Sequence, residues 1–298
     1  MISVVIPSYN RRECILTLLS DIYSQEGAVF EVIVVDDCSD DNTADAVSRQ
    51  YPQATLLINE RNRGPCVTRN RGIRTAKGKW VVGFDSDVTL PDRRLLAKAV
   101  TAFSESPDIT GLAFRLMKKD GKSEDWERWW HPRPIERFAN QQFLTSYFSG
   151  TAYAFRKEAL VEAGMYPEIF YMHYEEIELA LRIIDQGGKI LHCPDLVVLH
   201  HANEVSRRSE VNLYYKPRNQ ILLAMSCYPL WKGLVFVLPR IFYQFFLAAK
   251  GGHLKHFARA MGDALVKSRA VSRCPLKSDT FTIIQNLKME GCDITCES

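Results

Sequence analysis

Two aspartates one residue apart follow a short apolar run, and their spacing suits the binding of a cation. Asp85-Ser86-Asp87 comes directly after Trp80–Phe84, which has the pattern of a buried strand. Alternate residues of an extended chain point the same way, so both carboxylates can face one ligand. Carboxylates bind hard cations such as Mg²⁺, which in turn bind substrate phosphates. An aspartate turn that caps the helix expected after Pro91 is the other interpretation.

A second acidic segment follows the apolar run 32–35. Its first residues, Asp36 and Asp37, could accept a hydrogen bond from a nucleobase N–H, while the segment up to Thr43 forms a turn and a helix cap. A capping cluster without a ligand is the alternative. Arg69 lies on the helix that Asn62-Arg63-Gly64-Pro65 opens, and its guanidinium either reaches a phosphate or base or extends into solvent.

Two adjacent glutamates begin the helix expected over residues 174–186. Apolar residues recur there at helical spacing and form a buried stripe: Ile177, Ala180, Leu181 and Ile184. Glu175 and Glu176 occupy the first turn, where the helix dipole favours carboxylates, so capping is the simplest explanation for both. Neighbouring helix residues point about 100° apart, so only one of the two can face a given ligand group directly. Glu178 is better explained by an i,i+4 ion pair with Arg182.

These side chains need a scaffold that brings them together, and the chain up to about Arg115 predicts one. Short β-branched runs alternate with amphipathic stretches, which is typical of βαβ units, a largely parallel sheet and the α/β class. The expected strands are 2–6, 32–35, 54–58 and 80–84, and the expected helices are 12–24, 43–50, 65–76 and 92–104. Because ligands of open α/β sheets bind beyond the carboxyl ends of strands, the loops at 7–10, 36–39, 59–64 and 85–87 should converge.

The rest of the chain is less regular. Residues 118–137 are charged, rich in Trp and Pro, and fit neither period, which predicts a loop or lid. The apolar run 196–199 predicts a strand that ends at His200-His201. A histidine in that position can bind a metal, although such pairs are more often surface or core features. Beyond about Val211 the composition shifts toward aromatic and basic helices.

Bulk composition narrows the function. A chain of 298 residues with 46% hydrophobic content can bury a full core, and a net charge of only +3 argues against a duplex nucleic acid as partner. The eight cysteines include no C-x-x-C pair and are expected to be reduced, and no secretory signal is expected before the strand at Ile2. The sequence has no G-x-G-x-x-G after its first strand and no P-loop, which excludes a dinucleotide oxidoreductase and a P-loop phosphotransferase.

Seven segments in a fixed order give the chain a specific resemblance. They are Val4-Val5-Ile6-Pro7-Ser8-Tyr9-Asn10-Arg11, Val35-Asp36-Asp37-Cys38-Ser39, Asn62-x-Gly64-Pro65 with Arg69-Asn70-x-Gly72, Phe84-Asp85-Ser86-Asp87, Gly150-Thr151-Ala152-Tyr153-Ala154-Phe155-Arg156-Lys157, Gly164-Met165-Tyr166-Pro167-Glu168, and Tyr174-Glu175-Glu176-Ile177-Glu178-Leu179-Ala180-Leu181-Arg182. Together they resemble the family 2 glycosyltransferases of the GT-A fold over about residues 1–220. Residues 214–219 are similar to a segment of bacterial rhamnosyltransferase-like members.

The resemblance implies a role for each candidate residue. The implied nucleotide-binding residues are Pro7, Tyr9, Asp36, Asp37, Arg69, Asp85 and Ser86. The implied ligands of a Mn²⁺ or Mg²⁺ cofactor are Asp85, Asp87 and His200. Glu176 stands where the family usually has an aspartate base, and Glu175 would orient the acceptor or brace its loop.

The implied activity is transfer of a sugar, with inversion at the anomeric carbon, from a UDP-, GDP- or dTDP-sugar to a hydroxyl of a carbohydrate or lipid-linked carbohydrate. The resemblance also implies a place for this reaction in the biosynthesis of bacterial cell-surface polysaccharides or glycolipids. We expect a GT-A catalytic domain at 1–210, with its nucleotide-sugar half at 1–117 and its acceptor half at 118–210, and a helical region at 211–298. A non-catalytic nucleotide-sugar-binding protein and a nucleotidyltransferase are the alternatives.

The carboxyl-terminal helices raise the question of a membrane. Residues 220–249 are strongly apolar, but Pro229, Lys232, Pro239 and Arg240 interrupt them, so we expect no uninterrupted run long enough to span a bilayer. Basic residues interleave with apolar ones between 214 and 267, which leaves two interpretations: peripheral contact with a membrane, and packing onto the catalytic domain. We expect a cytoplasmic protein, placed at the inner face of the membrane under the first interpretation.

Overall fold

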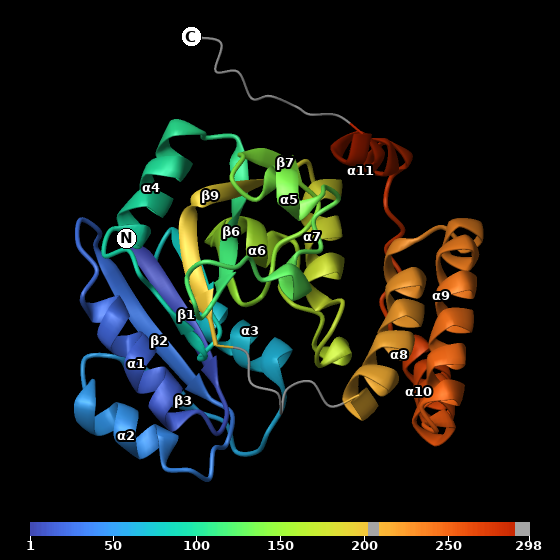
Figure 1. Ribbon diagram of the computed structural model, residues 1–298, viewed down its shortest axis with the longest axis horizontal. Coiled ribbons are helices and arrows are strands. Elements are labelled where there is room, and N and C mark those ends of the chain that lie inside the picture. Colours follow the sequence, from blue (N-terminus) through green and yellow to red (C-terminus); the bar gives the residue numbers. More distant parts are fainter. Residues whose placement is uncertain (202–208, 290–298) are drawn as a thin grey trace.

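The computed structural model describes residues 1–201 and 209–289, and its centre is a mixed sheet with helices on both faces (Figure 1). The strand order is β3-β2-β1-β4-β8-β6-β9-β5, and β7 pairs with β9. The strands are β1 Ile2–Ser8, β2 Phe30–Asp36, β3 Thr55–Ile58, β4 Trp80–Phe84, β5 Val88–Thr89, β6 Ile109–Lys118, β7 Phe143–Thr145, β8 Ala152–Arg156 and β9 Lys189–His200. All four strands expected from the amino-terminal pattern are present, and they pair in parallel.

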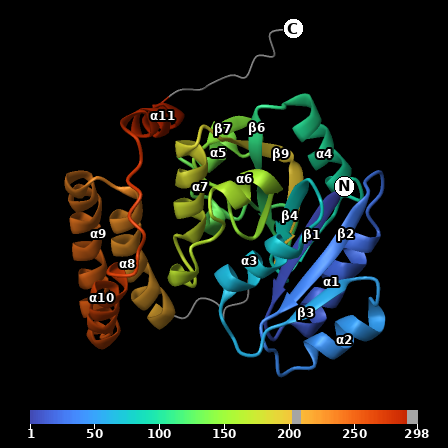
Figure 2. The same cartoon turned by 180° about the vertical axis from the view of Figure 1, so that it is seen from behind.

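The two faces of the parallel half are covered because its strands are apolar on both sides. In β1, Ile2, Val4 and Ile6 pack into one core while Val5 packs into the other, as the two-residue period of a strand requires. The first core is covered by α1 Arg12–Tyr23, α2 Thr43–Gln50 and α4 Leu95–Glu105. The second is covered by α3 Pro65–Thr75, α6 Lys157–Glu162 and α7 Glu175–Asp185, and Figure 2 shows this face.

The segment predicted to be a loop or lid is largely irregular. Between β6 and β7 it contains only two short helical pieces, η1 Trp126–Arg128 and α5 Ile135–Phe138. A third short piece, η2 Glu168–Phe170, precedes α7. Residues 118–137 lie near the carboxyl ends of the strands, where Asp125 and Trp126 reach the candidate site described below.

The predicted carboxyl-terminal helical region is present. It comprises α8 Ser209–Cys227, α9 Leu230–Lys250, α10 Leu254–Ser268 and α11 Ser278–Met289. α9 is longer than the sequence interruptions suggested, because Pro229 lies before its first residue and Pro239 is accommodated inside it. Among the described residues, α9 is the one helix that is long and apolar enough to cross a membrane, with a mean hydropathy of 1.3. Only 17% of its most apolar stretch is buried inside the protein. The boundary expected at residue 210 remains a prediction.

Candidate active site

The carboxyl ends of β1, β2 and β4 meet at one edge of the sheet, as predicted, and enclose a pocket of about 290 Å³ that we call the strand-edge pocket. The loops are tied together: the Asn10 backbone N–H donates to Ser39 Oγ and the Asp40 backbone N–H donates to Asn10 Oδ1, each at 2.9 Å. The predicted residues in the pocket wall are Pro7, Tyr9, Asp37, Asp85, Ser86, Asp87 and His200.

The two aspartates after β2 have internal partners. Asp37 accepts from the Asn59 side chain at 2.6 Å and from the Gly64 backbone N–H at 2.7 Å, so it fixes the loop between β3 and α3 as well as lining the pocket. Asp36, the last residue of β2, is buried and accepts from the Ser39 backbone N–H at 2.9 Å, and it is not part of the pocket wall. The N-cap residue of α2 is Asn42, which makes no side-chain cap hydrogen bond. Asp41, one residue earlier, accepts from the Thr43 backbone N–H at 3.1 Å.

The aspartates after β4 are not a helix cap. β5 follows them, and α4 begins only at Leu95, where Asp92 supplies the turn that precedes the helix. Asp85 accepts from Arg69 at 2.8 Å, whereas Asp87 lies 3.6 Å from Arg11 and 3.8 Å from the Nε2 atom of His200. Burial, followed by the nearby charge of Asp85, raises the pKa of Asp87.

The donor set around Asp87 fits a divalent cation by its chemistry, although within residues 1–201 and 209–289 no three such side chains are already gathered closely enough to hold one. Two carboxylates and an imidazole line the same pocket, but Asp85 is turned toward Arg69. His200 has the orientation that a ligand needs, because its Nδ1 atom lies 2.7 Å from Asp125 Oδ2 and its Nε2 atom faces Asp87.

Asp125 is a site residue that sequence reasoning missed. It lies in the segment 118–137, which contains none of the motifs, yet its side chain is buried beside His200 with relative exposures of 6% and 3%. Burial by itself would raise the pKa of Asp125, but the hydrogen bond to His200 acts in the opposite direction, and the pKa is lowered overall. An isolated acidic residue in an irregular, charged segment gave no signal, since its partner is 75 residues away.

A second cavity, of about 490 Å³, opens beside the first turn of α7, and we call it the α7 cavity. Aromatic rings form much of its wall: Trp126, Trp130, Tyr147 and Tyr174. Glu175 and Glu176 also line it, and so does Asp85, which is shared with the strand-edge pocket. Sugar rings offer apolar faces that pack on aromatic side chains, so the cavity suits a carbohydrate.

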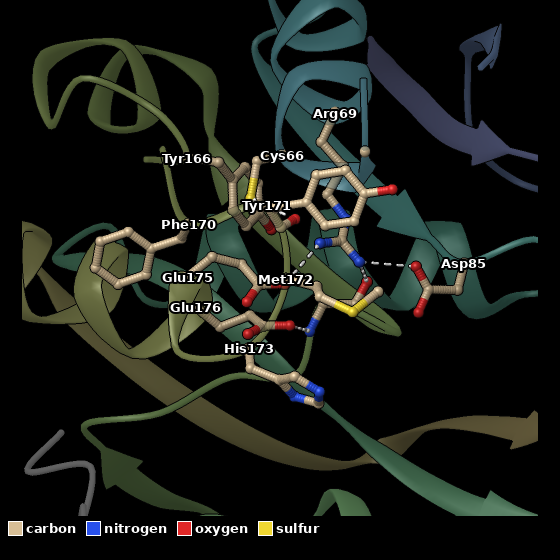
Figure 3. A network of polar contacts seen from close by, with 12 residues as sticks. Cys66, Arg69, Asp85, Tyr166, Phe170, Tyr171, Met172, His173, Glu175 and Glu176 are labelled. Carbon is tan, nitrogen blue, oxygen red and sulfur yellow. Dashed lines mark hydrogen bonds and ion pairs between the residues drawn. The ribbon is translucent and has the colours of Figure 1, made fainter. Parts of the chain in front are cut away.

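Arg69 lines the α7 cavity and contacts Asp85, which lines both cavities (Figure 3). It is buried, which excludes the solvent-exposed interpretation, and it lies 2.8 Å from Asp85 and 3.5 Å from Glu175. Glu176, which follows Glu175 in the sequence, accepts a hydrogen bond from the Gly150 backbone N–H at 3.2 Å. A Cβ added at position 150 would lie 2.5 Å from Glu176 Oε1 and 2.7 Å from a guanidinium nitrogen of Arg69, so a larger residue there would displace both side chains.

The two glutamates have different surroundings. Glu175 is 4% exposed, and burial, followed by the charge of Glu176, raises its pKa well above the usual range. Its Oε2 atom has no hydrogen-bond partner in the part of the chain that is described. Glu176 is only partly buried and opens into the cavity. The expected ion pair between Glu178 and Arg182 is confirmed, at 2.8 Å.

The loop before α7 is strained and is held from α8. Tyr171, His173 and Tyr174 all have φ between 65° and 68°, a conformation that non-glycine residues seldom adopt. The Asn219 side-chain amide donates to the carbonyls of Phe170, Met172 and His173 at 2.7–3.0 Å. Arg218 donates to the Phe170 carbonyl at 2.6 Å. Both α8 residues are buried, so the carboxyl-terminal region sets the entry to α7.

The chain is similar in sequence to known proteins. The model of glycosyl transferase family 2 matches residues 3–164. The succinoglycan biosynthesis protein ExoO of Rhizobium meliloti is 35% identical over 131 residues, which cover 41% of this chain and 38% of that protein. The chain spans about half or less of the length of the curated relatives it matches.

Solved structures share the fold. Residues 1–349 of S. aureus TarS in complex with UDP-GlcNAc give a TM-score of 0.62 at 19% identity, covering 97% of this chain and 87% of that one. The mannosyltransferase PcManGT of Pyrobaculum calidifontis, in complex with GDP-Man and Mn²⁺, gives 0.59 at 21% identity, covering 96% and 78%. The fold is therefore that of the GT-A transferases, and since the family model spans more than half of the chain, the protein belongs to glycosyl transferase family 2.

Proposed function

We propose that the protein transfers a sugar, with inversion, from a nucleoside diphosphate sugar to an acceptor hydroxyl. The observation that carries this proposal is the position of Asp85, which lines both the strand-edge pocket and the α7 cavity. A nucleoside in the first, against Pro7 and Tyr9, would place its diphosphate at Asp85 and Asp87 and its sugar toward Glu176. This is the alignment that an in-line displacement between two substrates requires.

Asp85, Asp87 and His200 would hold a Mn²⁺ or Mg²⁺ ion, as their oxygen and imidazole donors and the Mn²⁺ of the PcManGT complex support. When bound, the cation would neutralise charge on the departing diphosphate. Asp85 would exchange its contact with Arg69 for the cation, which leaves the guanidinium of Arg69 close to the diphosphate. Asp125 would keep the Nδ1 proton of His200 in place, so that the Nε2 lone pair faces the cation.

Glu176 is the proposed base. Inversion by a single displacement needs a carboxylate that takes the proton from the acceptor hydroxyl while the oxygen attacks the anomeric carbon. Glu176 opens into the α7 cavity. Glu175 is the poorer candidate because its raised pKa favours the protonated form and because it is buried against Arg69. We assign Glu175 the role of bracing Arg69 and the first turn of α7.

The proposed acceptor is a carbohydrate or a lipid-linked carbohydrate in the synthesis of a bacterial cell-surface polysaccharide or glycolipid, reached at the inner face of the membrane. The polysaccharide role of ExoO and the aromatic wall of the α7 cavity support it. The test begins with thermal stabilisation by UDP-, GDP- and dTDP-sugars in the presence of Mn²⁺. Product analysis with the stabilising donor and a panel of acceptors follows. Release of nucleoside diphosphate with formation of an inverted glycoside supports the proposal. Donor binding with no product from any acceptor, and no donor hydrolysis, would indicate a binding protein instead.

A further inference from the structure

α9 carries large apolar side chains on the side that faces away from the rest of the protein. Its buried residues, Gly233, Gln244 and Ala248, lie on the side that packs against α8 and α10. Figures 1 and 2 both show α9 at the outer edge of the molecule, beyond α8. Within the segment 214–267, for which membrane contact and packing onto the protein were the two interpretations, α9 is the helix that could do both. One side of α9 packs onto the protein, and the other side is exposed.

One continuous stripe lies opposite the packing residues. At about 100° per residue, positions 231, 235, 238, 242 and 246 fall within one sector of the helix. They are Trp231, Val235, Leu238, Phe242 and Phe246, with exposures of 65, 66, 64, 74 and 59%. Soluble monomers seldom leave a continuous apolar strip of this length in water, which indicates a partner.

The charge of the region identifies the partner as anionic. Residues 209–289 contain 12 Lys and Arg against 3 Asp and Glu, whereas residues 1–208 contain 26 against 29. Lys232 and Lys250 are about five helical turns apart and so share one edge of the stripe. Apolar residues bordered by lysines on a long helix are the pattern of helices that lie in the headgroup region of a bilayer.

α9 is long enough to cross a membrane, but its packing argues that it lies along the surface. α8 and α10 flank it over its buried side, and α8 is bonded through Arg218 and Asn219 to the loop before α7. A spanning α9 would have to leave both neighbours and bury Arg240 within the hydrocarbon core. We propose that α9 lies parallel to the surface of an anionic bilayer, with the apolar stripe immersed and the exposed Lys250 among the headgroups, while the ammonium of Lys232 lies 3.7 Å from the centre of the Phe281 ring.

Vesicle binding tests this surface without any substrate, so its outcome is independent of the proposed transferase activity. The full chain is sedimented with phosphatidylcholine vesicles that contain either no phosphatidylglycerol or about one third of it, at low salt. We expect binding to the anionic vesicles and a blue shift of Trp fluorescence that is absent in Trp231→Phe. Phe242→Glu should weaken binding about tenfold or more, because a carboxylate would enter the apolar layer. Val161→Glu is the matched control, since Val161 is 48% exposed on α6, away from the stripe.

Three outcomes would overturn the proposal. One is failure of the wild-type protein to sediment with anionic vesicles while circular dichroism shows it folded. Another is a concentration-dependent dimer that Phe242→Glu dissociates, which would make the stripe an interface between two copies. The third is retention of the protein in cell membranes after they are washed with alkaline carbonate, which would mean that α9 spans the bilayer. Release by carbonate is the expected result.

Discussion

The strand-edge pocket and the first turn of α7 lie on either side of Asp85, but they are held in different ways. At the strand edge, the loops after β1, β2 and β3 fix one another through Asn10, Asp37 and Gly64. At α7, the two glutamates depend on Arg69 from α3, Gly150 from the loop before β8, and Asn219 from α8. The loops of the strand edge thus come from neighbouring motifs, and His200 joins them from β9. The surroundings of the two glutamates at the first turn of α7, which we call the α7 end, are assembled entirely from distant parts of the chain. Changes at each end should accordingly affect different steps.

The largest effect is expected from the loss of the cation at the strand edge. Asp87→Asn, or EDTA with the wild type, should lower turnover by about 10³-fold or more, since a metal supplies several kcal/mol of charge stabilisation. Affinity for the nucleoside diphosphate should fall with it, because the carboxylates repel the phosphates when no cation is present. Isothermal titration with and without Mn²⁺ measures this. Equal affinity for the nucleotide in EDTA would contradict the metal assignment.

Glu176→Gln tests the proposed base at the first turn of α7. It keeps the shape of the side chain but removes the proton acceptor, so turnover should fall by at least about 10²-fold while nucleotide affinity stays nearly unchanged. Steady-state kinetics and nucleotide titration provide the two measurements. Glu175→Gln is the matched variant next to it and should retain more activity. If Glu175→Gln were inactive and Glu176→Gln nearly normal, the base would be Glu175.

Asn219→Ala tests whether α8 belongs to the α7 end. Removing three hydrogen bonds from the carbonyls of the strained loop should lower turnover by about tenfold or more, because small displacements of a catalytic group are costly. Nucleotide affinity should be unchanged, and hydrogen exchange should be faster in residues 171–178. Gln186→Ala, at the far end of α7, is the control. A parallel loss of nucleotide affinity would show that the two ends are not separable.

The smallest effect is on stability and depends on pH. Because the pKa of Glu175 is raised in the folded protein, the native state holds a proton that the unfolded state releases. The free energy of unfolding should therefore decrease as the pH rises from the unfolded pKa of a glutamate through the raised folded one. Glu175→Gln should flatten this decrease, as urea unfolding at several pH values between about 5 and 8 would reveal. A steeper slope in the variant would contradict the assignment.

Sequence reasoning predicted the strand edge well and the α7 end only in part. The loops that carry Asp37, Asp85 and Asp87 converge because parallel strands end at a common edge, a rule that needs no knowledge of side-chain packing. The burial of Arg69 was left open, since its partners Asp85 and Glu175 are distant in sequence and a helical period alone does not assign its side chain.

Two further features had no signal in the sequence. Asp125 lies in a segment with neither strand nor helix period, and only the path of β9 brings His200 to it. Arg218 and Asn219 lie in the segment 214–219 that the resemblance singled out, but no role for them followed from the sequence, because three carbonyls of an irregular loop present no side-chain pattern to match. Both belong to contacts in which one partner is a loop, whose course is set by the whole fold rather than by local propensity.

The hydrogen bonds from α8 to the loop before α7 have a consequence for the order in which parts of the protein fold during synthesis. A chain leaves the ribosome from its amino terminus, so the strand-edge pocket can form while residues 209–289 are still being synthesised. Tyr171, His173 and Tyr174 have costly backbone conformations. The side chains that donate to the carbonyls of this loop from α8 arrive only with Arg218 and Asn219. A nascent chain would therefore complete the strand-edge pocket before the entry to α7 is fixed, and α8, which fixes that entry, is followed directly by α9 with its apolar outer stripe.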